Sequence, residues 1–297
     1  MSDPGTTGPL RLCLVLSCFN RRELTLACLQ AAEASAAQAG LHLHAVLMDD
    51  GSRDGTAEAV QQRFAWVDVL RGDGSLYWCR GMHTAMVHAL TQAHDHYLWL
   101  NDDTLLQPEA LAQLARTAQQ LRAESKAPVI VVGSTQDPHS GRPSYGGRRR
   151  ASRWRPTRFE LVPPTLAPQR VDTFDGNIVW LSAEAVRAVG NLDAAYEHAM
   201  GDTDYGLRAE RAGVGVWLAP GFQGHCAENP AAGGFNDTAL PLRARWRAMR
   251  SRKGLPWRSW AHFTRRHAGW LWPIYFAWPY VRLLLSGLKP RPQQGTH

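Results

Sequence analysis

Two adjacent aspartates follow a short apolar segment near the middle of the chain. Residues 97–100 predict a buried strand, because they are apolar on both faces and too few for a helix. Asn101, Asp102 and Asp103 follow directly, and Pro108 then opens an Ala- and Leu-rich helical run. Hard oxygen ligands at the carboxyl end of a strand suit Mg²⁺ or Mn²⁺, which in turn binds phosphate. The alternative is a solvated turn that caps the helix.

Other polar motifs end other predicted strands. Residues 49–56, Asp-Asp-Gly-Ser-Arg-Asp-Gly-Thr, follow one apolar run, and Asn20 with Arg21 follows another. Strands are predicted at residues 12–17, 41–48, 66–70, 97–100 and 129–132, with helical runs between them. This alternation predicts parallel βαβ units with right-handed crossovers. Since parallel strands end at one edge of a sheet, the polar motifs should converge there.

The second half of the chain is less regular. Residues 135–173 are rich in Pro, Gly and Arg, which predicts a solvated loop or hairpin, or else a basic flap over an anionic substrate. A strand at residues 177–181 and a short helix follow. Asp202 and Asp204 then open a helix, and a strand at residues 214–218 leads to a loop that contains His225.

Charge and cysteine content limit the possible classes of protein. The 297 residues carry a net charge of +7, yet residues 241–297 hold twelve Lys and Arg and no acid. Residues 1–240 are therefore slightly acidic, at about −5. The five cysteines lack metal-site spacing and fall mostly in predicted strands or helices, which favours buried reduced thiols and a cytoplasmic location. The N-terminus has no apolar signal-peptide core.

The ordered set of motifs resembles family 2 of the glycosyltransferases, inverting enzymes with the GT-A fold. Residues 49–56 look like the family's DDGSxDGT signature, and residues 101–103 stand at its DxD position. Residues 201–204 resemble its ED-type segment. The Gly-Asp-Gly-Ser-Leu-Tyr-Trp stretch at residues 72–78 looks closest to bacterial rhamnosyltransferase-like members. The resemblance implies an α/β, Rossmann-like fold with a mostly parallel central sheet flanked by helices.

The resemblance also implies roles for individual residues. Those expected to bind the nucleotide or the donor sugar are Ser17, Asn20, Arg21, Asp50, Ser52, Trp78, Arg80, Asn101 and Asp102. Trp78 could instead be simple core packing. Arg80 lies at a predicted helix start, where N–H groups favour a diphosphate. Asn101 departs from the family pattern, which has an acid there, so Asp103 would be the main metal ligand and His225 a second one.

Two aspartates are candidates for the catalytic base. By alignment with the ED-type segment, Asp202 would take the proton from the acceptor hydroxyl as that oxygen attacks the anomeric carbon, which inverts its configuration. Asp204 is the reserve candidate, because the glutamate that usually precedes the base is Gly201 here. We expect Arg208, one turn further on, to pair with Asp204.

The C-terminal segment is basic and rich in tryptophan. Residues 269–285 are apolar for nearly the thickness of a bilayer, but Pro273, Pro279 and Arg282 interrupt them. An amphipathic helical segment at the membrane interface fits this pattern, and a helical lid on the catalytic domain is the alternative. Nucleic-acid binding has no further support in the sequence. We expect a GT-A domain at residues 1–235, with a nucleotide-binding half at about 10–135 and an acceptor half at about 170–228, and a helical appendage at residues 236–297.

Together these features predict a glycosyltransferase that uses Mn²⁺ or Mg²⁺ and a dTDP- or UDP-sugar. Its acceptor would be a lipid-linked or surface glycan, such as O-antigen or capsule, at the inner face of the cytoplasmic membrane. One alternative is a non-catalytic module that binds nucleotide-sugar or glycan on the same fold, which Asn101 and Gly201 would allow. A nucleotidyltransferase is disfavoured, because Cys18-Phe19-Asn20-Arg21 stands where a Gly-rich loop with Arg or Lys would be expected.

Overall fold

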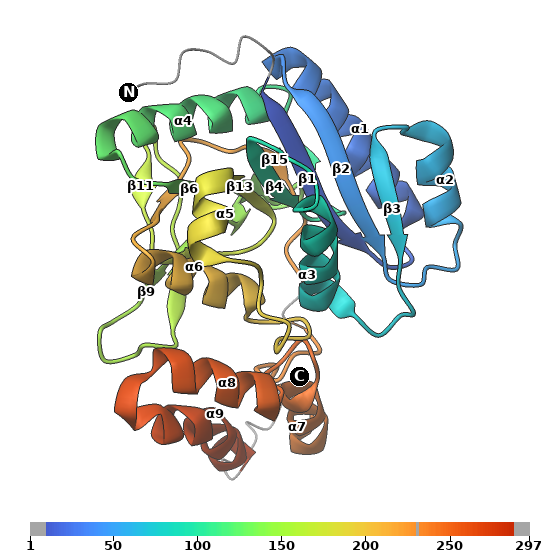
Figure 1. Cartoon of the computed structure of the whole chain (residues 1–297). Helices are drawn as coiled ribbons and strands as arrows, with labels where there is room; N and C mark the ends of the chain where they lie inside the picture. Colours follow the sequence, from blue (N-terminus) through green and yellow to red (C-terminus); the bar gives the residue numbers. More distant parts are fainter. Residues whose placement is uncertain (1–9, 230–231, 288–297) are drawn as a thin grey trace.

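A computed structural model describes residues 10–229 and 232–287. Their largest sheet has the strand order β11-β14-β6-β13-β4-β1-β2-β3 (Figure 1). All pairs of adjacent strands in it are parallel, except the two pairs that contain β13 and the pair of β11 with β14. Its strands are β1 (Arg11–Cys18), β2 (His42–Asp49), β3 (Val67–Arg71), β4 (His96–Leu100), β6 (Val129–Val132), β11 (Gln169–Arg170), β13 (Ile178–Ser182) and β14 (Gly215–Leu218). The predicted, mostly parallel α/β sheet is confirmed.

Helices cover both faces of this sheet, which gives three layers (Figure 1). Residues on one face of β1, such as Leu12 and Leu14, pack with α1 (Arg22–Ala39), α2 (Thr56–Arg63) and α4 (Ala110–Ser125). Those on the other face, such as Cys13 and Val15, pack with α3 (Tyr77–Ala89), α5 (Ala183–Val189) and α6 (Gly201–Arg211). The central strands are apolar on both faces because each face is covered by helices.

The arginine-rich region at residues 135–173 folds into small strands. Strand β9 (Gly147–Arg150) pairs with both β10 (Phe159–Leu161) and β12 (Thr173–Phe174) in antiparallel sense. A second small sheet has the order β5-β15-β7-β8 and contains β5 (Leu105–Leu106), β7 (Thr135–Gln136), β8 (Pro143–Tyr145) and β15 (Gly224–His225). Of the alternatives left open by the sequence, the hairpin describes the β9–β10 unit best.

The C-terminal region is helical and packs against the body. It contains α7 (Leu242–Arg250), α8 (Trp257–His267), a 3₁₀ turn (Gly269–Leu271) and α9 (Trp272–Gly287). Trp260 and Phe263 of α8 are buried in the same core as α3 and α6. In the part of the chain that the structure describes, no helix is both long and apolar enough to cross a bilayer. The predicted appendage at residues 236–297 extends beyond the described residues, which end at residue 287.

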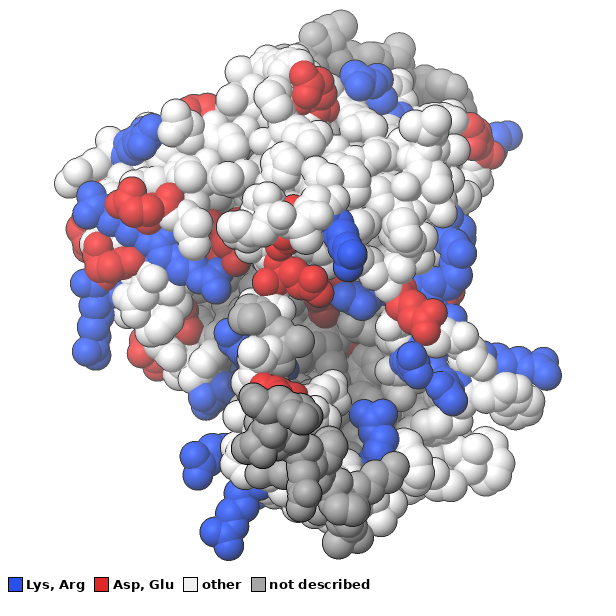
Figure 2. Space-filling view, turned by 180° about the vertical axis from the view of Figure 1, so that it is seen from behind, with Lys and Arg blue, Asp and Glu red and all other residues white. Residues whose placement is uncertain are grey.

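Charge is distributed unevenly over the surface. Figure 2 shows basic side chains around the lower part of the molecule, where the C-terminal helices lie, and acidic side chains beside basic ones near the middle of that face. All five cysteines are free and buried, as predicted from the sequence. Burial raises the pKa of Cys13 and Cys226 to about 12, so these thiols stay protonated at neutral pH.

Candidate active site

The polar motifs meet at one edge of the central sheet. Strands β1, β2 and β4 end there at Cys18, Asp49 and Leu100, since they run parallel in adjacent positions. Strand β13 runs the opposite way, and its first residue, Ile178, lies opposite Leu100. The residues before β13 therefore reach the same edge as the residues after β4.

A central cavity of about 780 Å³ opens at this edge. Six of its lining residues were predicted from the sequence to be at the site: Arg21, Trp78, Asn101, Asp102, Asp103 and Asp202. Trp78 is partly buried against the core, and its Nε1 donates a hydrogen bond to Asn101 Oδ1 over 2.8 Å. Asn101 is thereby held by a ring on the cavity wall, so Trp78 both packs against the core and lines the cavity.

Arg21 bridges the two adjacent aspartates. Its Nη1 lies 3.1 Å from Asp102 Oδ1 and 2.7 Å from Asp103 Oδ2. Burial raises the pKa of Asp102 to about 7, against the opposing effect of Arg21. The second oxygen of Asp102, Oδ2, is buried and has no hydrogen-bond partner. Asp102 is therefore a strongly perturbed carboxyl group on the wall of the central cavity.

The double aspartate is also the place where a divalent metal ion would fit. The buried, unpartnered oxygen of Asp102 and the partly exposed carboxylate of Asp103 are hard ligands of the kind that Mg²⁺ and Mn²⁺ prefer. His225 does not line the cavity. It lies in β15 opposite Leu105, and its neighbour Cys226 is the residue that approaches Asp103, with 3.6 Å between Sγ and Oδ1. A metal-binding role for His225 stays a prediction.

The signature loop after β2 is held by hydrogen bonds to the backbone of the loop that follows β3. Both carboxylate oxygens of Asp50 accept hydrogen bonds from the backbone N–H groups of Gly74, Leu76 and Tyr77, at 2.8–3.0 Å. Gly51 has a φ of +79°, and a Cβ there would lie 2.9 Å from Gly74 N, so only glycine fits. Asp50 therefore joins two loops of the rim and does not line the central cavity.

The other predicted donor-binding residues surround the same loops. Ser52 Oγ accepts a hydrogen bond from Asn20 N at 2.8 Å, which joins the loops after β1 and β2. Ser17 is buried at the end of β1, beneath the α3 residue Gly81. Arg80 donates a hydrogen bond to Ala194 O and lies 3.9 Å from Glu197. None of these four predicted residues lines the central cavity.

Asp202 lies across this sheet edge at the start of α6. It is half-buried, and its carboxylate accepts hydrogen bonds from Thr203 N at 2.7 Å and Gly176 N at 3.1 Å. Burial, helped by the negative charge of Asp175, raises the pKa of Asp202 to about 6. A carboxylate with this pKa is ionised at pH 7 and is more basic than an ordinary aspartate, as a proton acceptor in catalysis needs to be.

Asp204 occupies a different environment, although it is only two positions further along. It is fully buried and outside the central cavity. Its oxygens lie 2.8 Å from both Arg208 Nε and His267 Nε2, and 3.0 Å from Arg266 Nη1. Although burial acts to raise it, the net pKa of Asp204 is lowered, because these hydrogen bonds and positive charges favour the ionised form. The expected pairing with Arg208 is present, and Asp204 holds helices together at a distance from the cavity.

The cavity also contains residues that the sequence patterns did not single out. Asp175 and Asn177 line it, as do His198 and Lys253. Asp175 Oδ1 accepts a hydrogen bond from Arg148 Nε over 2.6 Å. The sequence does contain a signal for them, since Asp175 and Gly176 directly precede the predicted strand at residues 177–181. They would be expected at this edge of the sheet only if that strand runs antiparallel to its neighbours.

Comparisons with known proteins agree with this arrangement. The sequence profile described as glycosyl transferase family 2 matches residues 13–178. No protein with a curated description matches the sequence. Among solved structures, S. aureus TarS has a TM-score of 0.52 at 12% identity, with 81% of this chain and 38% of TarS covered. A structure of TarS residues 1–349 has a TM-score of 0.50 at 12% identity, with 73% and 60% covered.

At this identity the TarS structures show a shared fold, and the chain spans well under two thirds of TarS. The profile match covers more than half of the chain and includes strands β1 to β6 with the motifs that end β1, β2 and β4. The chain has a GT-A-like α/β fold with a helical C-terminal region and belongs to glycosyl transferase family 2.

Proposed function

We propose that this glycosyltransferase moves a hexosyl or deoxyhexosyl group from a dTDP- or UDP-sugar to a hydroxyl of a lipid-linked or surface-glycan acceptor, such as O-antigen or capsule. The fold itself implies a nucleotide-sugar donor and an acceptor. The observation that carries the proposed chemistry is the position of Asp202. A carboxylate with a pKa of about 6 lines the same cavity as the double aspartate.

In the proposed reaction Asp202 is the base. The acceptor oxygen attacks the anomeric carbon of the donor, the bond from that carbon to the diphosphate oxygen breaks, and the acceptor proton passes to a carboxylate oxygen of Asp202. Attack from the face opposite the diphosphate inverts the anomeric configuration. The backbone N–H groups of Thr203 and Gly176 hold the carboxylate in place, which supports its role as a fixed proton acceptor.

Residues on the opposite wall would hold the donor. Asn101, fixed by Trp78, and Asp102 would contact ribose or sugar hydroxyls, and Arg21 would add positive charge near the diphosphate. Asp103 is the proposed principal ligand of Mn²⁺ or Mg²⁺, which when bound would stabilise the charge of the departing diphosphate. Members of family 2 commonly use a divalent metal ion. We further propose that residues 1–235 form the catalytic domain and that residues 236–297 attach it to the cytoplasmic face of the membrane.

The proposal is tested by nucleotide release from a panel of dTDP-, UDP- and GDP-sugars, with and without Mn²⁺, in the presence of membrane lipid extract as acceptor. We expect turnover with one donor and loss of turnover on addition of EDTA. Binding of a donor without turnover under all of these conditions would contradict the proposed transfer and support the non-catalytic alternative.

A further inference from the structure

A second hollow adjoins the central cavity on the side of the C-terminal helices. Its volume is about 710 Å³, and we call it the aromatic groove after Trp260, Phe263, Tyr275 and Trp278, which line it. Trp260 and Phe263 are buried, whereas the side chain of Trp278 is 55% exposed. The groove therefore has a wall that runs from the protein core to the surface of α9, as a site for an elongated apolar ligand would require.

The groove continues into the central cavity. Met200, Phe235 and Asn236 line both hollows. Of two adjacent residues of α6, Asp202 lines the central cavity and Thr203 lines the groove. A molecule that lay in the groove and extended past Met200 would enter the cavity beside the proposed base.

The charge of the groove is entirely positive. Arg155, Arg158 and Arg282 line it, and no aspartate or glutamate is among its described lining residues. Arg158 lies 3.6 Å from Glu160 in an exposed pair, which has little energetic weight. Among the described residues neither Arg155 nor Arg282 forms an ion pair within 4 Å. Guanidinium groups that lie beside aromatic rings complement an anion attached to an apolar chain, and phosphate groups in particular.

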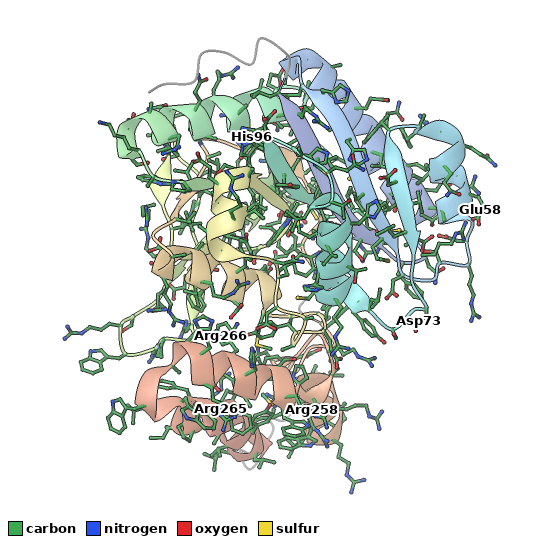
Figure 3. The ribbon with its side chains drawn as sticks, viewed as in Figure 1. Glu58, Asp73, His96, Arg258, Arg265 and Arg266 are labelled. Atoms are coloured by element: carbon green, nitrogen blue, oxygen red, sulfur yellow. The ribbon has the colours of Figure 1, made fainter. Side chains whose placement is uncertain are left out.

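The helix α9, which contributes Trp278 to the groove, also carries exposed apolar side chains. Trp270, Ile274 and Leu285 are between 51% and 86% exposed, on the 3₁₀ turn and α9. The hairpin between β9 and β10 lies against this helix, since Tyr275 Oη donates a hydrogen bond to Trp154 O over 2.9 Å. Figure 3 shows Arg258 and Arg265 on α8, which packs against α9. Exposed tryptophans among arginines are typical of a surface that lies at a bilayer interface.

We propose that the aromatic groove binds the lipid end of the acceptor, an amphiphile that carries a diphosphate next to an apolar chain. The arginines contact the diphosphate, the aromatic wall contacts the chain, and the attached saccharide passes Met200 to present its hydroxyl to Asp202. The groove site rests on the proposed transfer reaction, because it assigns the acceptor that this reaction uses.

The test measures binding of farnesyl diphosphate to the full-length protein by titration calorimetry, beside farnesol and inorganic diphosphate. We expect farnesyl diphosphate to bind at least about tenfold more tightly than either fragment, since each fragment makes half of the contacts. Arg155→Gln and Arg282→Gln should each weaken its binding about tenfold, as expected for loss of a charge-assisted hydrogen bond. Arg247→Gln is the matched control, because Arg247 is an exposed α7 residue outside the groove.

Two further measurements distinguish binding in the groove from attachment to a membrane and from the transfer reaction. Vesicles of phosphatidylglycerol report attachment to a membrane, and the Arg155→Gln and Arg282→Gln proteins should still bind them nearly as well as the wild type. The Asp202→Asn protein should bind farnesyl diphosphate normally, so failure of the transfer reaction would leave the groove intact. The groove proposal is overturned if farnesyl diphosphate binds no better than inorganic diphosphate, or if the groove substitutions weaken only vesicle binding.

Discussion

Asp202 and Asp204 lie two positions apart on α6, yet Asp202 lines the central cavity and Asp204 is fully buried beside His267, 2.8 Å away. The pKa values of the two carboxylates are also shifted in opposite directions. The pKa of Asp202 is raised to about 6, and that of Asp204 is lowered. These differences support the proposal that Asp202 accepts the proton and that Asp204 attaches the C-terminal helices. Figure 3 shows Arg266, a partner of Asp204, on the α8 side that faces the body.

Asp204→Ala should strongly destabilise the fold. The substitution leaves Arg208 without its carboxylate partner and removes the acceptor of the hydrogen bonds from Arg266 and His267. Removal of one partner from a buried ion pair typically costs about 3–5 kcal/mol. Urea denaturation at pH 7 measures it. The stabilisation by this lowered-pKa carboxylate is present above its unfolded pKa and lost as the pH falls through its folded value. An Asp204→Ala protein as stable as the wild type would contradict a structural role.

The rate of sugar transfer should increase with pH through about 6 and then level off. Asp202 accepts a proton only when ionised, and burial together with Asp175 raises its pKa to about 6. Asp175→Asn removes the neighbouring negative charge, so the midpoint of the pH profile should move to lower pH. Arg247→Gln, which removes an exposed charge outside the central cavity, serves as the control. A midpoint that Asp175→Asn moves upward, or leaves unchanged, would be inconsistent with Asp202 as the base.

The dependence of turnover on a divalent metal ion should change when Asp103 is replaced. Asp103→Asn removes a hard anionic ligand from the cavity wall and should raise the Mn²⁺ concentration needed for half-maximal turnover by at least about tenfold. His225→Ala tests the second predicted ligand, and a similar increase is expected if His225 contributes. Unchanged Mn²⁺ dependence in the Asp103→Asn protein would refute the metal assignment. The same result for His225→Ala alone would remove only that residue from it.

Gly201 replaces the glutamate that the family pattern places before the base, and its surroundings explain this. A Cβ at Gly201 would lie 2.3 Å from Cys79 Sγ. Gly201→Ala should therefore lower the free energy of unfolding by about 1–3 kcal/mol through overpacking. In a protein that already carries Cys79→Ala, the same Gly201→Ala substitution should lower the free energy of unfolding by less than it does in the wild type. Additive effects in this double-mutant cycle would show that the contact with Cys79 is not the cause.

Much of the fold is predictable from the sequence because the central strands are short apolar runs. Residues 97–100 and 129–132 are strands within one residue of prediction, since both faces of the sheet are covered by helices. The direction of β13 was not predictable, because an apolar strand reads the same in either direction. Asp175, which precedes it, was missed for that reason.

Other features depend on contacts between distant parts of the chain. The resemblance to the family placed Asp202 ahead of Asp204 as the base. The sequence alone could not show the environment of Asp204, since Arg266 and His267 lie more than sixty residues later. Residues 241–297 contain no acid, so the partly buried Arg266 pairs with carboxylates of the body: with Asp204 and, at 2.8 Å, with Asp193. α8 packs on the body, whereas several apolar side chains of α9 are exposed. Attachment of this segment to a membrane stays a prediction.

The most direct test compares wild-type and Asp202→Asn proteins for nucleotide release and for donor binding, with the donor identified in the panel. Loss of general-base catalysis should reduce release about 10²–10⁴-fold, while donor affinity changes by less than about threefold. Circular dichroism and urea denaturation should show the variant folded, since Asn keeps the shape of the side chain. Release by Asp202→Asn at the wild-type rate would contradict the assignment of Asp202 as the catalytic base.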